Sequence, residues 1–358
     1  MKIETLRMVN FRRFVDQQLD WQEGIHLLWG ANGEGKTSVI EAIHVLATSR
    51  SFRSAKDQEM VRFGSERAAL SGAGVGADAR EELRVVLGSG PRQLERSGKR
   101  VGLMGYAGAL EAVVFGGGSL DIARGGPQAR RRFLDRAIAA GRPSYLRTLG
   151  RYGRALSAWR EVALHAGAAA AAELESYEEL LGLYGAEIQQ RRAEYVDQIG
   201  GQLEGRYREL FGAAEGVSVR YRPSPTGRAP HRPERLQAGF AASRRAALAA
   251  PGPQRDDMEL LIDRQSLRTA GSAGQQRGVV LALILWVAER TGAQRGSAPI
   301  LLIDDLEAEL DPERARRLVS TLARMGQVFV TSTRRDIAAW QPGAAVYELR
   351  GGEIERAA

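Results

Sequence analysis

The strongest chemical signal in the chain is one glycine-rich segment, Gly30-Ala31-Asn32-Gly33-Glu34-Gly35-Lys36-Thr37. It matches G-x-x-x-x-G-K-[ST] at every position, follows an apolar run and precedes a helical pattern. Glycines in such a loop let backbone N–H groups surround phosphate oxygens, and the N-terminus of the helix adds positive potential. We predict that Lys36 reaches the β- and γ-phosphates of a nucleotide and that Thr37 holds Mg²⁺. Ser38 completes the predicted binding segment.

A second candidate element is the apolar run Ile300–Ile303, which ends in the paired carboxylates Asp304 and Asp305. An acid at the end of a buried strand, combined with a phosphate-binding loop, is typical of nucleotide sites that bind Mg²⁺. Asp304 is then placed to hold the magnesium through water, and Asp305 to orient the attacking water. Together with Lys36, these carboxylates are the predicted catalytic residues.

The elements that position these residues follow from the hydrophobic pattern. Residues 1–29 predict short strands, and residues 66–101 predict a Gly-rich antiparallel β region. From Pro127 to about Phe211 the pattern is helical. Past Val217 we expect a short strand, a Pro/Arg-rich loop, a helix and then strand–helix alternation.

Two apolar seams at helical spacing predict an antiparallel helical hairpin inside the helical region. The seam residues are Tyr145, Leu149, Tyr152, Leu156 and Trp159 on the first arm, and Leu174, Tyr177, Leu181, Tyr184 and Ile188 on the second. An Ala/Gly-rich stretch at 166–172 separates the arms. A first arm of roughly 22 residues is about 33 Å long, far shorter than a coiled-coil rod.

Composition excludes several classes of site. The 358 residues contain no cysteine, so disulfides, thiolate metal sites and cysteine nucleophiles are excluded. The four histidines are scattered along the chain, which argues against a zinc centre. The longest uncharged apolar stretch, 278–288, is too short for a membrane span of about 20 residues. The N-terminus has no signal-peptide pattern, and we expect a cytoplasmic protein with no membrane partner.

The charge balance is basic, with 51 Lys+Arg against 43 Asp+Glu and a net charge of +8. Nearly all of the basic residues are arginines, which suit bidentate phosphate contacts, although a biased genome composition explains the excess equally well. The candidate DNA contacts are a cluster, Arg130, Arg131 and Arg132, and a stripe off the first apolar seam, Arg147, Arg151 and Arg154. A further group surrounds the Pro-rich loop: Arg220, Arg222, Arg228 and Arg232. For each group, a solvated face or pairing with the acidic second arm is the competing interpretation.

A third motif, Ser272-Ala273-Gly274-Gln275-Gln276, lies just before the apolar helical run of 279–287. With this motif in place, the chain resembles the ABC-type ATPases and, among them, the bacterial RecF recombination-repair family, a compact relative of the SMC proteins. The other segments that carry the resemblance are Asn10–Phe14, Arg131–Asp135, Gly252–Asp257, Asp304–Asp305 and Glu309–Asp311. They follow the order of the family along essentially the whole chain.

The resemblance implies an α/β fold: an ABC-type P-loop ATPase lobe with an antiparallel β region, plus an inserted, mainly helical lobe without a long coiled coil. We expect residues 1–125 to form the N-terminal part of the ATPase lobe and 126–216 the inserted lobe. Residues 217–358 would form the C-terminal part of the ATPase lobe, with the signature motif and the second carboxylate motif.

The resemblance also implies that ATP, with Mg²⁺, is sandwiched between two subunits. The signature residues Ser272, Gly274 and Gln275 of one subunit would then contact the γ-phosphate of the ATP that the other subunit holds. ATP should therefore hold a homodimer together. By the same resemblance Arg12 is a phosphate contact, although an ordinary surface arginine is the alternative.

Some positions depart from related patterns. Typical ABC ATPases carry glutamate where this chain has Asp305, and a histidine after the next strand, where 328–333 has none. Both features predict weak orientation of the attacking water and therefore slow hydrolysis, a timer rather than a motor. Gln254 replaces a histidine that is usual in the RecF family, and 116–118 is unusually Gly-rich.

By resemblance, the expected function is an ATP-controlled DNA clamp at gapped or single-strand/double-strand junction DNA in recombinational repair. It would act with RecR and RecO to help load RecA. The main alternative is an ABC-type ATPase subunit coupled to a protein or membrane partner. A small-molecule P-loop kinase would not need the Ser272 motif, and the arm is too short for an SMC-type cohesion factor.

Overall fold

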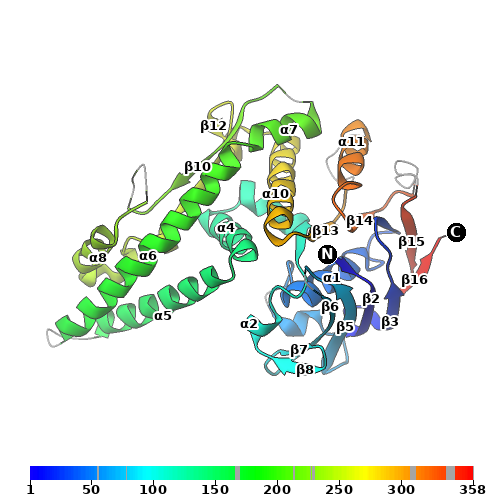
Figure 1. Cartoon of the computed structure of the whole chain (residues 1–358), viewed down its shortest axis with the longest axis horizontal. Coiled ribbons are helices and arrows are strands. Elements are labelled where there is room, and N and C mark those ends of the chain that lie inside the picture. The colour runs from blue at the N-terminus through cyan, green and yellow to red at the C-terminus, as the bar shows by residue number, and fades with distance from the viewer. Residues whose placement is uncertain are drawn as a thin grey trace. The chain divides into compact units, whose positions relative to one another are not determined.

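The chain divides into two compact units. The computed structural model describes residues 1–54, 56–77, 79–165, 170–212, 214–225, 227, 230–306, 312–335 and 343–357. The first unit comprises Met1–Leu120, Arg208–Gly212 and Val280–Ala358, and the second comprises Asp121–Tyr207 and Ala213–Val279. Figure 1 shows the elements of both units along the chain.

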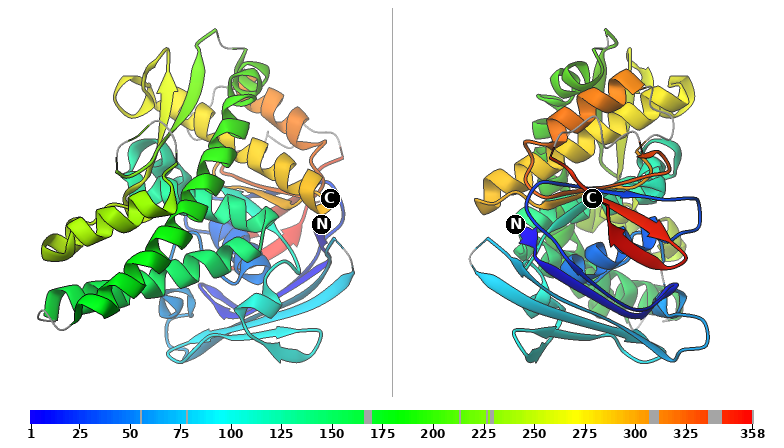
Figure 2. Two further views of the ribbon diagram at one scale, coloured as in Figure 1. Left: turned by 60° about the vertical axis from the view of Figure 1, so that its left-hand side comes forward. Right: turned by 90° about the vertical axis from the view of Figure 1, so that its right-hand side faces the viewer.

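The first unit contains an antiparallel sheet with the strand order β3-β2-β5-β6-β7-β8, and β1 pairs with β5. Its strands are β1 (Lys2–Ile3), β2 (Thr5–Phe11), β3 (Phe14–Asp20), β5 (Arg67–Val75), β6 (Arg80–Gly88), β7 (Gln93–Arg96) and β8 (Lys99–Val101). Buried and exposed residues alternate along β6, as expected of a strand with one face on a core. This sheet is the predicted antiparallel β region, and it forms the lower layer in the right-hand view of Figure 2.

A second, mainly parallel sheet carries the chemistry. Its order is β16-β15-β4-β14-β13-β9, and only β16 is antiparallel to its neighbour. The strands are β4 (Ile25–Trp29), β9 (Ala112–Phe115), β13 (Ile300–Ile303), β14 (Val328–Ser332), β15 (Ala345–Arg350) and β16 (Glu353–Arg356). All residues of β13 and β14 are buried, which explains their continuous apolar runs. Because neighbouring parallel strands end at the same edge, β4 and β13 deliver their following loops to one place.

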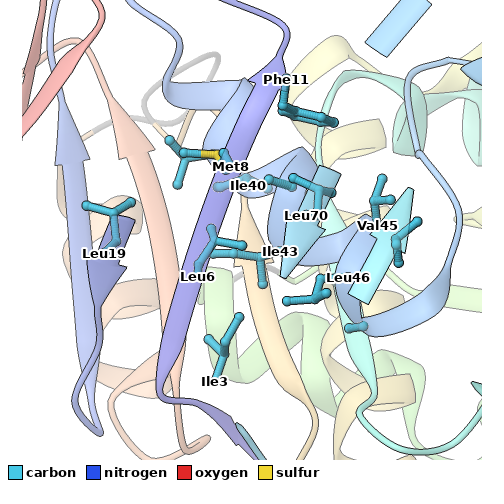
Figure 3. Packing of buried hydrophobic residues seen from close by; sticks show 14 of the residues in the cluster. Ile3, Leu6, Met8, Phe11, Leu19, Ile40, Ile43, Val45, Leu46 and Leu70 are labelled. Atoms are coloured by element: carbon cyan, nitrogen blue, oxygen red, sulfur yellow. The ribbon is translucent and has the colours of Figure 1, made fainter. Parts of the chain in front are cut away.

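Helix α1 (Lys36–Thr48) packs between these two sheets. Ten consecutive residues, 38–47, are buried, as expected of a helix that is covered on every side. Figure 3 shows Ile40, Ile43 and Leu46 of α1 beside Leu6 and Met8 of β2. Ile300, Leu302 and Phe329 of the parallel sheet belong to the same cluster. This packing fixes α1, and therefore the loop that precedes it.

The second unit is built on the predicted helical hairpin. Helix α5 (Ser144–His165) has 22 residues and packs against α6 (Ala171–Gly200). Seam residues Tyr145, Tyr152 and Trp159 of α5 and Leu174, Leu181 and Ile188 of α6 are buried, so the predicted hairpin is confirmed. Helix α8 (Pro233–Ala242) packs along the other side of α6, as Figure 1 shows. Residues 166–169 of the predicted Ala/Gly-rich turn lie outside the described ranges.

Smaller elements complete both units. The second unit contains a three-stranded sheet of β10 (Val217–Arg222), β11 (Asp257–Ile262) and β12 (Gln265–Ser266), with the order β10-β11-β12. The remaining α-helices are α2 (Leu103–Tyr106), α3 (Asp121–Arg124), α4 (Pro127–Gly141), α7 (Leu203–Phe211), α9 (Leu267–Ala270), α10 (Ala273–Arg295) and α11 (Pro312–Leu322). Over the described residues, no helix is long and apolar enough to span a membrane.

The observed division differs from the expected lobe boundaries. Residues 217–279, which we expected in the ATPase lobe, group with the helical unit. The physical reason is that β10 packs on α6 and β11 packs on α4, so this segment shares the core of the helical unit.

Candidate functional site

The glycine-rich loop connects β4 to α1, as its motif predicts. Gly30 is buried where β4 ends, and a Cβ atom there would lie 2.5 Å from the carbonyl oxygen of Leu349. Gly35 has φ +100°, and a Cβ atom would lie 2.9 Å from side-chain carbons of Arg13 and Phe14. Both glycines are therefore required by close approach. Between them, Ala31, Asn32 and Gly33 are exposed, and Glu34 is half-buried.

The N-terminus of α1 suits a polyphosphate. Among the described residues, no side chain caps this end, and its first turn contains no acid. Its N–H groups and the helix dipole therefore favour an anion. The Lys36 ammonium lies over the loop, where Nζ donates to the carbonyl oxygens of Gly30 at 2.6 Å and Ala31 at 2.9 Å. Ser38 is buried in the first turn.

The two predicted magnesium ligands come together across 267 residues of sequence. Thr37 Oγ1 donates a hydrogen bond to Asp304 Oδ1 at 2.9 Å. Asp304 is only 8% exposed, and its N–H bonds to the carbonyl oxygen of Phe115 at 2.7 Å, which anchors the residue beyond β13. A hydroxyl and a carboxylate beside a phosphate-binding loop are the oxygen ligands that Mg²⁺ prefers. The residues present therefore fit Mg²⁺ and a nucleotide phosphate.

Asp305 differs from Asp304 in exposure and backbone. It is exposed and adopts φ +58°, a left-handed conformation that is uncommon for residues other than glycine. Its N–H donates to Thr331 Oγ1 at 2.7 Å. The acidic segment 309–311 that contributed to the resemblance lies outside the described residues.

The two arginines of the N-terminal motif have different partners. Arg12 makes a bidentate pair with the buried Glu41 of α1, at 2.8 and 2.7 Å, and donates to Ser54 Oγ at 2.6 Å. Its predicted contact with phosphate stays a prediction. Arg13 reaches the loop itself, because it donates to the Gly33 carbonyl and pairs with Glu34 at 3.2 Å.

In the second unit, the signature motif forms the N-terminus of α10. Ser272 precedes the helix and accepts a hydrogen bond from the Gln275 N–H at 3.2 Å, and Gln275 Oε1 accepts from the Ser272 N–H at 2.8 Å. This reciprocal pair is a capping box. Gln275 also donates to Glu215 at 3.0 Å. Ser272 is exposed and Gly274 is half-buried, so the helix presents its positive end at the surface of this unit.

The candidate DNA-binding arginines separate into buried and exposed groups. Arg130 is 7% exposed and pairs with Asp257 at 2.7 and 3.0 Å. We therefore correct its assignment: a buried, paired guanidinium holds α4 to β11 and is not part of a DNA surface. Arg131 is half-buried and donates to the Asp256 carbonyl at 2.7 Å, whereas Arg132 is exposed.

The stripe on α5 has the exposure that its spacing predicts. Arg147, Arg151 and Arg154 are all exposed, and the Arg151 guanidinium lies 6.0 Å from the centre of the Tyr184 ring. In the third group, Arg220, Arg222 and Arg232 are exposed, and Arg222 pairs with Glu259 at 2.8 Å. Arg228 lies outside the described residues.

Comparison with known proteins identifies the family. A family profile described as an AAA domain matches residues 5–102. The DNA replication and repair protein RecF of Anaeromyxobacter dehalogenans (strain 2CP-1) is 35% identical, and the match covers 99% of both chains. RecF of Synechococcus sp. (strain JA-3-3Ab) is 33% identical over 99% of this chain and 97% of its own. The chain belongs to the RecF family.

Solved structures agree with this assignment. A structure described as the recombination mediator protein RecF-ATP in the RecFOR pathway matches with a TM-score of 0.88 and 26% identity, over 99% of this chain and 97% of that one. The Smc head domain of Pyrococcus furiosus bound to ScpA matches with a TM-score of 0.60 and 16% identity, which shows a shared fold alone. The expected fold, an ATPase lobe with an antiparallel sheet and a short helical arm, is confirmed.

Two departures from the RecF pattern have structural explanations. Gln254 Oε1 accepts a hydrogen bond from the Tyr152 hydroxyl, and its Nε2 donates to the carbonyls of Ala250 and Pro251 at 2.9 and 3.1 Å. One amide thus serves an acceptor role and two donor roles, which a neutral histidine cannot do. At Gly116, a Cβ atom would lie 3.2 Å from Asp304 Cβ, a tight contact that glycine avoids.

Two residues of the site do not follow from the motifs. Thr331 donates to Asp304 Oδ1 at 2.8 Å, and Arg13 anchors the glycine-rich loop. Arg13 belongs to the N-terminal motif, but spacing alone does not say which of two adjacent arginines reaches the loop. For Thr331 the only signal in the sequence is a hydroxyl residue at the end of an apolar strand.

Proposed function

We propose that this RecF-family chain is an ATP-dependent DNA-binding protein of recombinational repair. The main support is that Lys36, Thr37 and Asp304 lie together at the uncapped N-terminus of α1 in the first unit. When bound, Mg²⁺ neutralises charge on the β- and γ-phosphates. Thr37 would hold the metal, Asp304 would hold it through water, and Lys36 would bind the phosphates.

ATP joins two copies of the chain in this proposal. The support is that Ser272 stands exposed at the start of α10 while its Oγ accepts from the Gln275 N–H. Accepting one bond leaves the hydroxyl proton of Ser272 to donate to a phosphate oxygen. The positive end of α10 adds to this attraction. The signature of one copy therefore caps the γ-phosphate that the other copy holds.

Hydrolysis is slow and acts as a timer. Asp305 orients the attacking water, and its carboxylate is one methylene shorter than the glutamate of typical ABC ATPases. Those enzymes also carry a histidine after the next strand, whereas residues 328–333 here contain none. The protein therefore orients the attacking water at the γ-phosphate less firmly than typical ABC ATPases do. A turnover above about 10 s⁻¹ would contradict the proposal.

DNA binds through its phosphates to the stripe Arg147, Arg151 and Arg154, with Arg132 as an additional contact. The support is the exposure of these side chains and the basic balance of the chain. The preferred substrate is gapped or single-strand/double-strand junction DNA. RecR, RecO and RecA are the proposed protein partners. The RecFOR pathway named for the related structure supports RecO and RecR, and RecA rests on the family resemblance.

A pair of variants at Ser272 tests the ATP sandwich. Ser272→Asp keeps a good N-cap for α10 but places a negative charge against the γ-phosphate of the partner's ATP. Ser272→Asn is close to it in size, also caps the helix and is neutral. Light scattering with saturating ATP should give a dimer for the wild type and Ser272→Asn, and a monomer for Ser272→Asp. A dimer of Ser272→Asp as stable as the wild type, or a wild type that stays monomeric, would contradict the proposal.

A further inference from the structure

Thr331 bonds to both acidic residues that follow β13, although it is on a different strand. It is the fourth residue of β14, which pairs in parallel with β13, with Val330 opposite Ile303. Asp304 directly follows β13, so it lies level with Thr331. Thr331 is 1% exposed within a strand whose five residues are all buried. A hydroxyl in such a place needs hydrogen-bond partners to offset its loss of water.

The partners of Thr331 fix the direction of its proton. The Asp305 N–H lies 2.7 Å from Thr331 Oγ1 and can only donate, so Oγ1 accepts there. The hydroxyl has one proton, and Asp304 Oδ1 lies 2.8 Å away as an acceptor. The proton is therefore directed at Asp304. The Thr331 carbonyl oxygen also accepts from the Leu306 N–H at 3.1 Å, so one residue binds three successive positions after β13.

These bonds fix the rotation of the Asp304 carboxylate and the backbone conformation of Asp305. Asp304 Oδ1 accepts hydrogen bonds from the hydroxyls of Thr37 and Thr331, and these bonds set the rotation of its carboxylate. Asp305 has a left-handed backbone, φ +58°, which persists only where the surroundings fix it. Its bond to Thr331 Oγ1 fixes the peptide from which the Asp305 side chain projects.

We propose that Thr331 is a positioning residue that sets the orientation of both Asp304 and Asp305. It acts through its bonds to the Asp304 carboxylate and the Asp305 N–H. The inference rests on the ATP hydrolysis proposed above, but it concerns a residue that the nucleotide motifs do not include. Partners that orient metal ligands typically change activity or metal affinity about 10- to 100-fold when removed.

The test compares Thr331→Val, which keeps the shape and removes the hydroxyl, with Thr331→Ser, which restores the hydroxyl. Thr291→Val is the matched control, because Thr291 of α10 is also 1% exposed. We expect Thr331→Val to lower kcat by about 10- to 100-fold with little change in KM for ATP. Thr331→Ser should return kcat to near the wild-type value, and Thr291→Val should leave it unchanged.

A second measurement separates this inference from the proposed hydrolysis. The affinity for a fluorescent ATP analogue, titrated over Mg²⁺ concentration, reports on Asp304 without turnover. Thr331→Val should shift the Mg²⁺ midpoint upward, and Thr331→Ser should not. If the wild type does not hydrolyse ATP, the proposed hydrolysis fails and the Mg²⁺ midpoint alone decides the role of Thr331. An unchanged midpoint, or a kcat of Thr331→Val equal to that of Thr291→Val, overturns the inference.

Discussion

Asp304 and Asp305 are neighbours in sequence, yet their surroundings give them different chemistry. Asp304 is buried and accepts hydrogen bonds from two hydroxyl groups, so its carboxylate has a fixed direction. Asp305 is exposed, and its backbone N–H is bound to Thr331. A fixed carboxylate suits metal coordination, whereas an exposed one suits the orientation of a water molecule.

The variant Asp305→Asn tests the role of the exposed carboxylate. Asparagine tolerates the left-handed backbone and keeps the N–H bond to Thr331, so the fold and the affinity for ATP should be retained. The neutral amide cannot polarise water as a carboxylate does, and turnover should fall by about 100-fold or more. Single-turnover hydrolysis measures the rate, and titration with a fluorescent ATP analogue measures binding. Turnover equal to that of the wild type would exclude Asp305 from the reaction.

Sequence patterns predict the candidate residues of the site, but not the hydrogen-bond and ion-pair partners that distant segments bring to them. The glycine-rich loop, Lys36 and Thr37 follow from one local motif, because strand, loop and helix N-terminus are consecutive in the chain. The burial of Arg130 does not follow, because its partner Asp257 is 127 positions away in sequence. The same holds for Thr331 and for the pairing of Arg12 with Glu41. Residue spacing predicts which face of an element is buried, but not which charge from another element lies against it.

Within the first unit, an ion pair joins β9 to the end of α10. Glu111 lies just before β9, and its carboxylate is 3.5 Å from the Arg295 guanidinium at the C-terminus of α10. Burial raises the pKa of Glu111 to about 7, and the nearby Arg295 only partly opposes this shift. The folded chain therefore binds this proton more tightly than the unfolded chain does.

The raised pKa of Glu111 predicts a pH-dependent stability. Between its ordinary pKa of 4.5 and about 7, the folded state holds more protons, so the free energy of unfolding falls as pH rises through this window. Glu111→Gln removes the titration and should be more stable than the wild type at pH of about 8, by at most about 3 kcal/mol. Urea denaturation at pH of about 5 and 8 measures the difference. An identical pH dependence for both proteins would contradict the assignment.

Buried charges also join the elements of the second unit. Arg192 of α6 binds Asp135 of α4 at 2.9 Å and Asp256 at 3.0 Å. Burial alone would lower the pKa of Arg192, but the two carboxylates raise it above its ordinary value. Asp256 also accepts from Gln189 at 2.9 Å and from the Ser224 N–H at 2.8 Å. The segments 131–135 and 252–257, which carry part of the family resemblance, therefore belong to one polar core that holds the hairpin in place.

The chain has a net charge of +8, and the proposed DNA contact uses one exposed part of that charge, the α5 stripe. Charge reversal of Arg147, Arg151 and Arg154 to Glu tests the α5 stripe. The matched control reverses Arg235, Arg245 and Arg268, which are also exposed and lie on other elements of the same unit. Both triples change the net charge equally. The stripe variant should bind DNA more weakly, and the slope of its salt dependence should fall by roughly one for each phosphate that the protein no longer neutralises. Equal effects of the two triples would place the DNA-binding surface elsewhere.

Fluorescence anisotropy of labelled gapped DNA measures whether ATP controls DNA binding. The protein is titrated with and without ATP, and Lys36→Met, which lacks the ammonium over the phosphate loop, is measured alongside. We expect the wild type to bind more tightly with ATP, and Lys36→Met to lose this response. Binding that is absent in both conditions, or that tightens equally in Lys36→Met, would contradict the account and favour an ATPase coupled to a protein or membrane partner.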